Sequence, residues 1–485
     1  MAEQKLGTKV ATGVAWSFSE KLLTMIIQMV VSIIVARQLS PDDFGVMAIM
    51  TFFTSVALTI VDSGFSQTLI RKSNTSNEEY SSVFAFNVVV SLLLYVVLVA
   101  LAKPLAAFYG DMVIADIAPV LFLVLPINAL CVVQTVMFTR EFRFALLSKI
   151  VFAASLISGV VAVAMALAGY GVWSLVAQRL LQMGIKAAAF WIIRRWRVSW
   201  RIGISPLREM APFSLRLLAT DLIASIYNNV AQLFIGKMHN TSMLGYYSQA
   251  QKLKDLPVTS TVQAVQGVTY PALSTMADDR EKLTVGYGRI VNLVSYLLFP
   301  VMLGLVAVAP EMFALLLGDK WMPTVPYFEI LALAGVVYPL SVVSYNILKV
   351  KSDGRLILRL EILKRLLMTV MLCYTIPRGV ESIAWGMSAM AAVDFIINTL
   401  FALRYVDMGV GAFLRVVAPQ FLLASAMFVL LYAINPYCES MSVGIHLLID
   451  IVVGGAFYLS LSYILRLSAF DEGLELLRSM RSKSE

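Results

Sequence analysis

The sequence contains few of the residues that build catalytic sites, metal centres and disulfide frameworks. Its 485 residues include two histidines and three cysteines, and 14% of the residues are charged. A soluble globular domain is roughly 25% charged. Cys131, Cys373 and Cys438 are scattered, with neither metal-ligand nor disulfide spacing. The chain also lacks a Gly-Lys-Ser/Thr loop for phosphates. We therefore expect no enzyme, no nucleotide-driven pump, and no cofactor or metal.

Long hydrophobic runs fill most of the sequence, since 59% of the residues are hydrophobic. A run of roughly 20 apolar residues can cross a bilayer, and a helix satisfies its backbone hydrogen bonds within one segment. The charged start 1–10 lacks the short cleavable apolar core of a signal peptide. The pattern predicts an all-α membrane protein with about fourteen transmembrane helices, at 11–36, 43–62, 81–102, 113–138, 145–167, 170–193, 211–236, 243–267, 284–308, 323–346, 355–376, 380–404, 411–433 and 443–465.

Positive charge is distributed unevenly over the connections between these spans. Most Lys and Arg residues of the loops fall on one side, which places both termini in the cytoplasm. The net charge of +8 reflects this bias, so we expect no nucleic-acid partner. The longest central connection, 194–210, is rich in arginine. We interpret it as a cytoplasmic linker that also lies on anionic lipid headgroups.

An internal repeat relates the first pair of spans to the seventh and eighth. At a shift of 200 residues, Gly45 coincides with Gly245, and Gln28, Arg37 and Phe44 coincide with Asn228, Lys237 and Leu244. Parallel repeats of this kind build transporters, whose substrate sites lie near the bilayer midplane between the repeats. We predict two six-helix lobes and two additional C-terminal helices, divided as 1–193 (N-lobe), 194–210 (linker), 211–404 (C-lobe), 405–467 (last two spans) and 468–485 (cytoplasmic tail).

Hydrophilic side chains interrupt several spans at membrane depth, most densely in 211–236 and 243–267. Ionisable groups at this depth are costly and usually face a bundle interior or a water-filled cavity. In spans 6 to 8 the cations outnumber Asp221 and Asp255, which predicts a cationic cavity for an anionic substrate. Amides in the same spans suit sugar hydroxyls. The predicted cavity residues are Lys21, Gln28, Arg179, Lys186, Arg216, Asp221, Asn228, Asn229, Gln232, Gln249, Lys252, Lys254 and Asp255.

Three stretches resemble one family of membrane transporters. They are LGYYSQAQKLKDLPVTSTVQAVQGVTYPALSTMADDREKL (Leu244–Leu283), LLGDKWMPTVPYFEILAL (Leu316–Leu333) and the opening hairpin IVARQLSPDDFGVMAI (Ile34–Ile49). They are similar to the Wzx-type lipid-linked oligosaccharide flippases of the multidrug/oligosaccharidyl-lipid/polysaccharide exporter superfamily, in the colanic-acid and teichuronic-acid exporter branch. The likeness extends over spans 1 to 12 and does not specify a sugar.

The resemblance implies a fourteen-helix fold with a central cavity, lined by spans 1, 2, 7 and 8, and alternating access by rocking of two lobes. It implies a flippase of the bacterial inner membrane, whose substrate is an undecaprenyl-pyrophosphate-linked oligosaccharide in contact with membrane lipids. A polysaccharide polymerase and a chain-length regulator are candidate partners. Related drug exporters bind a coupling ion on carboxylates of the first lobe, and here the candidates are Glu20 and Asp62.

Two alternatives stay open at this point. An ion-coupled antiporter of small cationic drugs would use the same fold, but it predicts that acids dominate the cavity. A non-transporting scaffold of a synthesis complex predicts that the cavity charges can be replaced freely.

Overall fold

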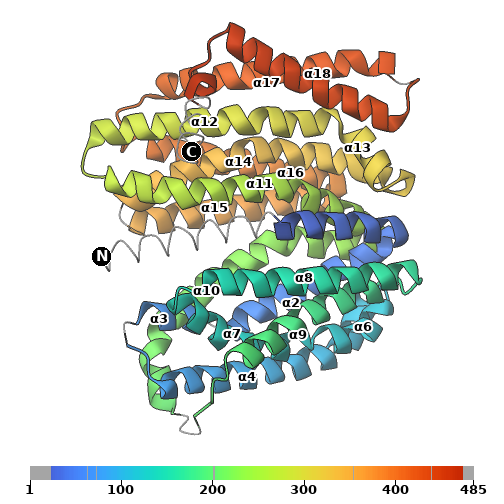
Figure 1. Ribbon diagram of the computed structural model, residues 1–485, viewed down its shortest axis with the longest axis vertical. Coiled ribbons are helices and arrows are strands. Elements are labelled where there is room, and N and C mark those ends of the chain that lie inside the picture. Colours follow the sequence, from blue (N-terminus) through green and yellow to red (C-terminus); the bar gives the residue numbers. More distant parts are fainter. Residues whose placement is uncertain are drawn as a thin grey trace. The chain divides into compact units, whose positions relative to one another are not determined.

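The computed structural model describes residues 23–62, 64–72, 74–199, 203–352, 354–438 and 440–472. In these ranges the chain forms helices joined by turns, with no strand (Figure 1). Nine of the described helices are long and apolar enough to cross a membrane. The prediction of an all-helical membrane protein is therefore confirmed, while the number of fourteen spans and the side on which the termini lie stay predictions.

Contacts divide the chain into two compact units, Met1–Ser248 and Gln249–Glu485, with the boundary inside α11 (Thr241–Thr275). This division follows packing, whereas the predicted lobes follow the sequence repeat, so the predicted boundaries stay predictions. The described helices of the first unit, before α11, are 23–38, α2 (Pro41–Asp62), α3 (Phe65–Arg71), α4 (Asn77–Ala100), α5 (Ala102–Tyr109), α6 (Val113–Leu121), α7 (Val124–Arg140), α8 (Phe144–Leu167), α9 (Trp173–Ile193) and α10 (Ile204–Met238).

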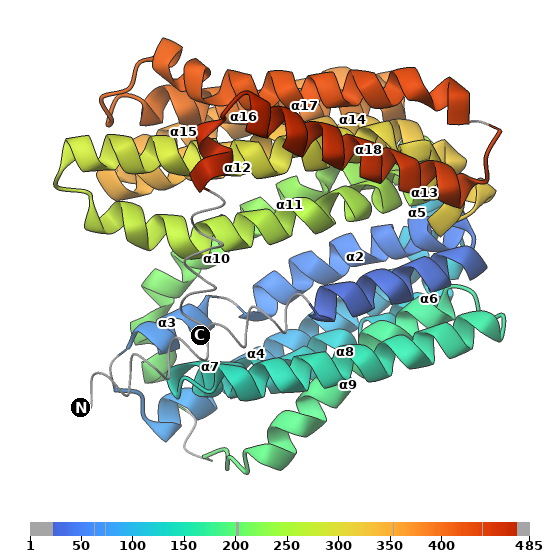
Figure 2. The ribbon, with the colours of Figure 1, turned by 45° about the horizontal axis from the view of Figure 1, so that its top comes forward.

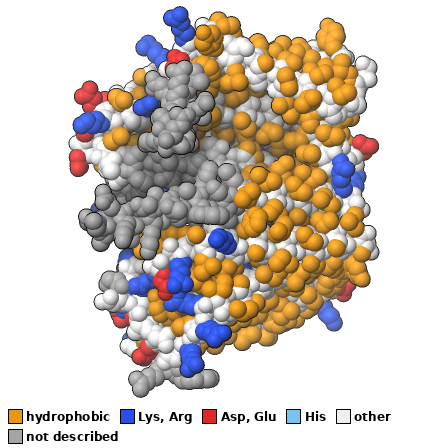
Figure 3. All heavy atoms as spheres, in the orientation of Figure 1, with side chains coloured by type: hydrophobic (Ala, Val, Ile, Leu, Met, Phe, Trp, Pro, Cys, Tyr) orange, Lys and Arg blue, Asp and Glu red, His pale blue; other side chains and the backbone are white. Residues whose placement is uncertain are grey.

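Within each unit the long helices run side by side, and hydrophobic side chains cover much of the visible surface (Figures 2 and 3). Val89, Leu93 and Val96 of α4, for example, are all more than half exposed. Such a surface is stable against acyl chains rather than water. Polar caps fix some helix ends, since Ser76 and Glu79 form a capping box at the start of α4. The cap starts α4 at Asn77, four residues before the predicted span.

Short helices and one helix break differ from the predicted spans. The predicted span 113–138 consists of α6 and α7, which are separated at Phe122 and Leu123. Pro126 lacks the N–H that would bond the carbonyl group of Phe122 in a continuous helix, so the helix breaks there. The helices α5 and α13 (Ala309–Leu316) were not predicted, because eight residues are too few for a periodic hydrophobic signal.

The central connection is attached to the first unit rather than free. Its second half is helical, because α10 already begins at Ile204. Trp196 donates its indole N–H to Asn77 (2.6 Å), and the backbone N–H of Ser199 donates to Ser81 (2.8 Å). The backbone N–H of Gly203 donates to Ser82 (3.0 Å). The first turns of α4 thus hold the linker in place.

The starts of α2 and α11 cross at very short range in the first unit. A Cβ atom added at Gly45 would lie 1.8 Å from the carbonyl oxygen of Thr241. A Cβ atom added at Gly245 would lie 1.9 Å from the carbonyl oxygen of Pro41. The two contacts are therefore reciprocal. Gly45 packs on the carbonyl group of the residue four positions before Gly245, and Gly245 packs on the carbonyl group of the residue four positions before Gly45. Only residues without a side chain allow two helices to approach this closely.

The second unit is built around α14 (Val325–Lys351), which packs against α12 (Arg280–Ala307) and α16 (Val380–Ala402). α15 (Gly354–Thr375) packs on α16, and the short helices η1 (Asp319–Thr324) and η2 (Ile376–Arg378) precede α14 and α16. The last two helices, α17 (Val410–Cys438) and α18 (Val443–Ile464), belong to this unit.

Polar contacts fix these last helices to the rest of the second unit. Gln420 of α17 donates to the side-chain oxygen of Asn292 on α12. The hydroxyl of Tyr458 on α18 donates to the carbonyl group of Tyr296 (2.9 Å). The start of the predicted tail is also anchored, since Arg289 of α12 forms an ion pair with Glu472 (3.0 Å). The remainder of the tail, from residue 473, lies outside the described residues.

Candidate functional site

A hollow of about 490 Å³ lies within the first unit, between the C-terminal part of α2 and the helices α3, α7, α9 and α10. Three of the predicted functional residues meet there: Asp62, Lys186 and Asp221. The other polar lining residues are Thr59, Ser66, Asn128 and Thr135. Charged and polar side chains thus share this hollow with apolar ones such as Leu58 and Val132, and intramembrane charges in such a setting are usually retained for function.

The turn after α2 positions Asp62 in this hollow. Its carboxylate accepts a hydrogen bond from the hydroxyl of Ser66, one turn later. Between them Gly64 adopts φ = 68°, and a Cβ atom there would lie 2.6 Å from the carbonyl oxygen of Ser214 on α10. A side chain would be strained by both the backbone angle and the contact. Gly64 therefore lets the α2–α3 turn approach α10, so that Asp62 lies within the electrostatic range of Asp221.

Lys186 supplies the positive charge of the hollow. It lies on α9, with its ammonium group 5.5 Å from the centre of the Phe190 ring, and it acts electrostatically on Cys131 across the hollow. Two carboxylates and one ammonium group therefore share this space, together with hydroxyl and amide groups. The sequence predicted an excess of cations over spans 6 to 8, whereas this hollow holds more acidic than basic side chains. Such a set can bind a polyhydroxylated ligand and one anionic group of it.

The remaining predicted residues of the first unit lie outside the lining of this hollow. Glu20 and Lys21 are outside the described residues. Gln28, Arg179, Arg216 and Asn228 have exposed side chains, and Gln232 is half-buried. Asn229 donates to the carbonyl group of Ser225 within α10 (2.9 Å). Their assignment to a substrate cavity stays a prediction.

The predicted residues of α11 belong to the second unit. Lys254 forms an ion pair with its neighbour Asp255 (2.7 Å), and Lys252 is exposed. Gln249 is 1% exposed, so its side chain is buried, and its assignment to a substrate cavity stays a prediction.

Sequence reasoning missed the uncharged residues of the hollow. Thr59, Asn128 and Thr135 lie in the apolar spans of α2 and α7 and carry no charge, so the pattern of intramembrane charges did not indicate them. An amide in an apolar span was the available signal for Asn128, because an amide at membrane depth also needs hydrogen-bond partners.

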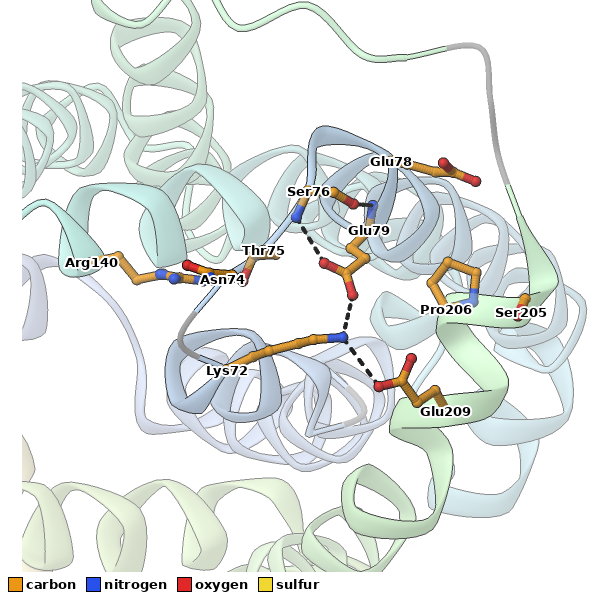
Figure 4. Close-up of a pocket in the computed structure, with 10 residues that line it drawn as sticks. All are labelled: Lys72, Asn74, Thr75, Ser76, Glu78, Glu79, Arg140, Ser205, Pro206 and Glu209. Atoms are coloured by element: carbon orange, nitrogen blue, oxygen red, sulfur yellow. Dashed lines mark hydrogen bonds and ion pairs between the residues drawn. The ribbon is translucent and has the colours of Figure 1, made fainter.

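A second pocket, of about 720 Å³, lies in the first unit between residues 72–79, Arg140 and the start of α10. Figure 4 shows Lys72 between the carboxylates of Glu79 (2.5 Å) and Glu209 (3.2 Å). The hydrogen bonds with these carboxylates raise the pKa of Lys72 above its ordinary value of 10.5. Arg140 donates to the carbonyl group of Leu69 (2.9 Å) and to Thr75. These charges bind one another, so we interpret the pocket as an attachment of α10 to the loop before α4.

The arrangement of the helices is that of a known class of membrane protein. The chain is similar to the solved structure of the lipid II flippase MurJ in an inward closed conformation, with a TM-score of 0.72 and 16% identity over 92% of this chain and 98% of that chain. The structure therefore has the MurJ fold, and the protein is a multi-pass membrane protein.

Sequence comparison identifies the family to which the chain belongs. Residues 34–326 match the family described as polysaccharide biosynthesis protein, and the chain belongs to this family. The teichuronic acid biosynthesis protein TuaB of Bacillus subtilis (strain 168) is 23% identical over 93% of this chain and 95% of its own length. The succinoglycan biosynthesis transport protein ExoT of Rhizobium meliloti (strain 1021) is 26% identical over 68% of this chain and 67% of its own. The resemblance to Wzx-type transporters is thereby confirmed.

Proposed function

We propose that the protein is a flippase that moves an undecaprenyl-pyrophosphate-linked oligosaccharide from the inner to the outer leaflet of the bacterial inner membrane. The observation that carries the proposal is the polar hollow of Asp62, Lys186 and Asp221 inside a bundle of apolar helices. The family, the names of TuaB and ExoT, and the fold shared with MurJ support a substrate from polysaccharide synthesis.

The side chains of the hollow divide the binding of a lipid-linked sugar between them. Lys186 holds the pyrophosphate or an acidic sugar through a charge-assisted hydrogen bond. Thr59, Asn128 and Thr135 exchange hydrogen bonds with sugar hydroxyls, and Asp62 and Asp221 accept hydrogen bonds from them. The lipid tail stays among the acyl chains, because transferring each of its CH₂ groups to water costs about 0.8 kcal/mol.

Transport by alternating access also needs an outer end that opens and closes. The crossing of α2 and α11 is a suitable closure, since Gly45 and Gly245 bring the two helix starts into contact. Asp42 accepts hydrogen bonds across this crossing from Thr241 (2.7 Å) and Ser242 (2.6 Å). By the predicted orientation this contact lies at the outer surface. Opening to the outside would separate these groups and expose them to water, which replaces their hydrogen bonds at small cost.

Replacement of Lys186 and Asp221 tests the proposal. We expect Lys186→Gln with Asp221→Asn to abolish polymer export by cells that depend on this protein, with the protein still in the membrane at its normal level. Lys103→Gln, which changes an exposed lysine of α5 away from the hollow, is the matched control and should export normally. Normal export by the double variant would contradict the assignment of the hollow.

A further inference from the structure

The second unit carries its own polar face halfway along its helices. Tyr338 lies at the middle of α14 and is 46% exposed. Glu361, Lys364 and Arg365 lie at the middle of α15, and Asp394 lies near the middle of α16. By the predicted spans, the midpoints of these helices lie near the centre of the bilayer, so these groups are far from either headgroup region.

The charged groups of α15 are already neutralised within this face. The ammonium group of Lys364 bonds to Glu361 and lies 3.5 Å from the side-chain oxygen of Asn398. Arg365 lies 3.7 Å from the second oxygen of Glu361. The ring of Tyr345 lies 5.3 Å from the Lys364 ammonium group. The carboxylate of Glu361 thus pairs with both Lys364 and Arg365. The second acidic side chain of this face is Asp394 on α16.

Tyr338 stands where several of these helices converge. Its hydroxyl lies within the electrostatic range of Asp255 on α11, Asp394 on α16 and Arg365 on α15. Seven residues separate Tyr338 from Tyr345, which is two helical turns, so both rings project from the same side of α14. The face therefore combines two aromatic rings with carboxylates and a guanidinium group.

This face is unsuited to contact with acyl chains. The side chains of Arg365 and Asp255 are 32% and 41% exposed at the depth where exposure of a charge to lipid is most costly. Charged groups in such positions line water-filled paths in membrane proteins. We therefore expect water and a polar ligand at this face.

The hydrogen-bonding state of Asp394 indicates the chemistry of that ligand. Within the part of the chain that the structure describes, its Oδ1 atom is buried without a hydrogen-bond partner. A carboxylate oxygen needs a donor, and leaving it unsatisfied is costly. A hydroxyl group supplies such a donor, whereas a phosphate would bring a second anion to a region whose cations are already neutralised. The orphaned acceptor favours a polyhydroxylated, uncharged group.

We propose that Tyr338, Arg365, Asp394 and Asp255 form a saccharide-binding site in the second unit. The ring of Tyr338 stacks on the apolar face of a sugar ring, and Asp394 and Asp255 accept hydrogen bonds from its hydroxyls. Arg365 donates to the sugar oxygens. The site rests on the proposed function and makes it more specific, because it recognises the oligosaccharide and not the pyrophosphate.

Two lipids that differ only in the sugar separate this inference from the proposed function. We would measure binding of purified lipid-linked oligosaccharide and of plain undecaprenyl pyrophosphate to the full chain in nanodiscs, by native mass spectrometry. The wild type should bind the oligosaccharide-bearing lipid more tightly. Tyr338→Ala should weaken that binding by roughly fivefold to tenfold, which is the order of an aromatic contact, and leave binding of the plain lipid unchanged. Tyr338→Phe keeps the ring and should stay within about twofold of the wild type.

Tyr432→Ala, which removes another exposed tyrosine of the second unit, is the matched control and should change neither affinity. Asp394→Asn provides a second test of the same site and should also weaken only the oligosaccharide-bearing lipid. If Tyr338→Ala and Asp394→Asn bind both lipids as the wild type does, or weaken both equally, the saccharide site is overturned while the flippase proposal stands. If the wild type binds neither lipid, the proposed function fails, and the site fails with it.

Discussion

Asp42 accepts a hydrogen bond of 2.6 Å from Ser242, and these two residues occupy equivalent positions of the internal repeat, 200 residues apart. Three residues further along, Gly45 and Gly245 make the reciprocal backbone contacts of the same crossing. The pairing of equivalent positions is what a local two-fold axis between α2 and α11 produces. Residues near such an axis meet their own counterparts, and the two glycines make equivalent contacts on either side of it.

Alanine at Gly45 should force α2 and α11 apart. The new Cβ atom would overlap the carbonyl oxygen of Thr241, and backbone atoms cannot move aside as a flexible side chain can. We expect a loss of about 1–3 kcal/mol of stability, as for other overpacked contacts. Thermal unfolding of the purified protein measures it. Gly184→Ala is the control, because a Cβ atom there meets nothing within 4 Å. Equal melting temperatures for the two variants would contradict the close crossing.

A disulfide across the crossing should stop transport. After alanine has replaced the free cysteines Cys131, Cys373 and Cys438, cysteines at Asp42 and Ser242 would face one another. Oxidation should then block polymer export, and a reductant should restore it, because the closed outer end could no longer open. Each single-cysteine variant controls for the substitutions themselves. Unimpeded export by the cross-linked protein would refute the assignment of this crossing as an opening closure.

Alanine at Gly64 should impair the hollow of the first unit while changing no charge. The φ angle of 68° costs an alanine roughly 1–2 kcal/mol, and its Cβ atom would also press on Ser214. The turn would shift and carry Asp62 away from Asp221. We expect reduced polymer export together with a lower melting temperature. Gly110→Ala separates the two causes, since it has a similar φ of 75° but no neighbour within 4 Å and lies far from the hollow in the chain. Normal export by Gly64→Ala would rule out a positioning role for the turn.

On the alkaline side, the ion pairs of Lys72 should weaken only at very high pH. Because the folded state raises the pKa of Lys72 above 10.5, their contribution is complete below that pH and disappears as the pH rises through the folded-state pKa. Lys72→Met should therefore lower the melting temperature at about pH 9, by the small amount typical of exposed ion pairs, and the difference from the wild type should shrink as the pH rises through the folded-state pKa of Lys72. A difference that grows with pH would contradict the assignment.

Removal of His446 should bring two acidic side chains of the second unit into unfavourable proximity. His446 of α18 lies 3.6 Å from Glu311 of α13 and 3.5 Å from Asp450, and all three side chains are largely buried. His446→Leu removes the polar side chain between Glu311 and Asp450 and leaves these two acids facing one another, so we expect a lower melting temperature. Adding Glu311→Gln and Asp450→Asn should recover much of the loss in thermal unfolding. Failure of the triple variant to recover would show that packing alone explains the effect of His446.

The hydrophobic pattern predicted much of the fold, because a membrane allows few structures for an apolar run. The ends and breaks of helices were less predictable. The break at Phe122 depends on Pro126, which a hydropathy window averages away. The start of α4 depends on the capping pair Ser76 and Glu79, which lies outside the apolar run. Local backbone and capping interactions set these helix boundaries, and a hydropathy average does not detect them.

The candidate site was predictable only in part, since a sequence gives the depth of a residue but not its partners. Lys186 and Asp221 were predicted from their place within the spans and Asp62 as a candidate for ion coupling, and all three meet in one hollow. Gln249 also lies on a span with many polar residues, yet its side chain is buried. The group around His446 requires Glu311, 135 residues earlier in the chain, and no local pattern connects them.

The hydrogen bonds of the linker also bear on how the chain is made. The partners of Trp196, Ser199 and Gly203 are Asn77, Ser81 and Ser82, all of which leave the ribosome before the linker does. The linker can therefore dock as soon as it emerges, while the second unit is still being translated. Domains generally fold in this order during synthesis. The nascent first half would then reach the insertion machinery's exit already assembled, as a scaffold on which the later helices gather.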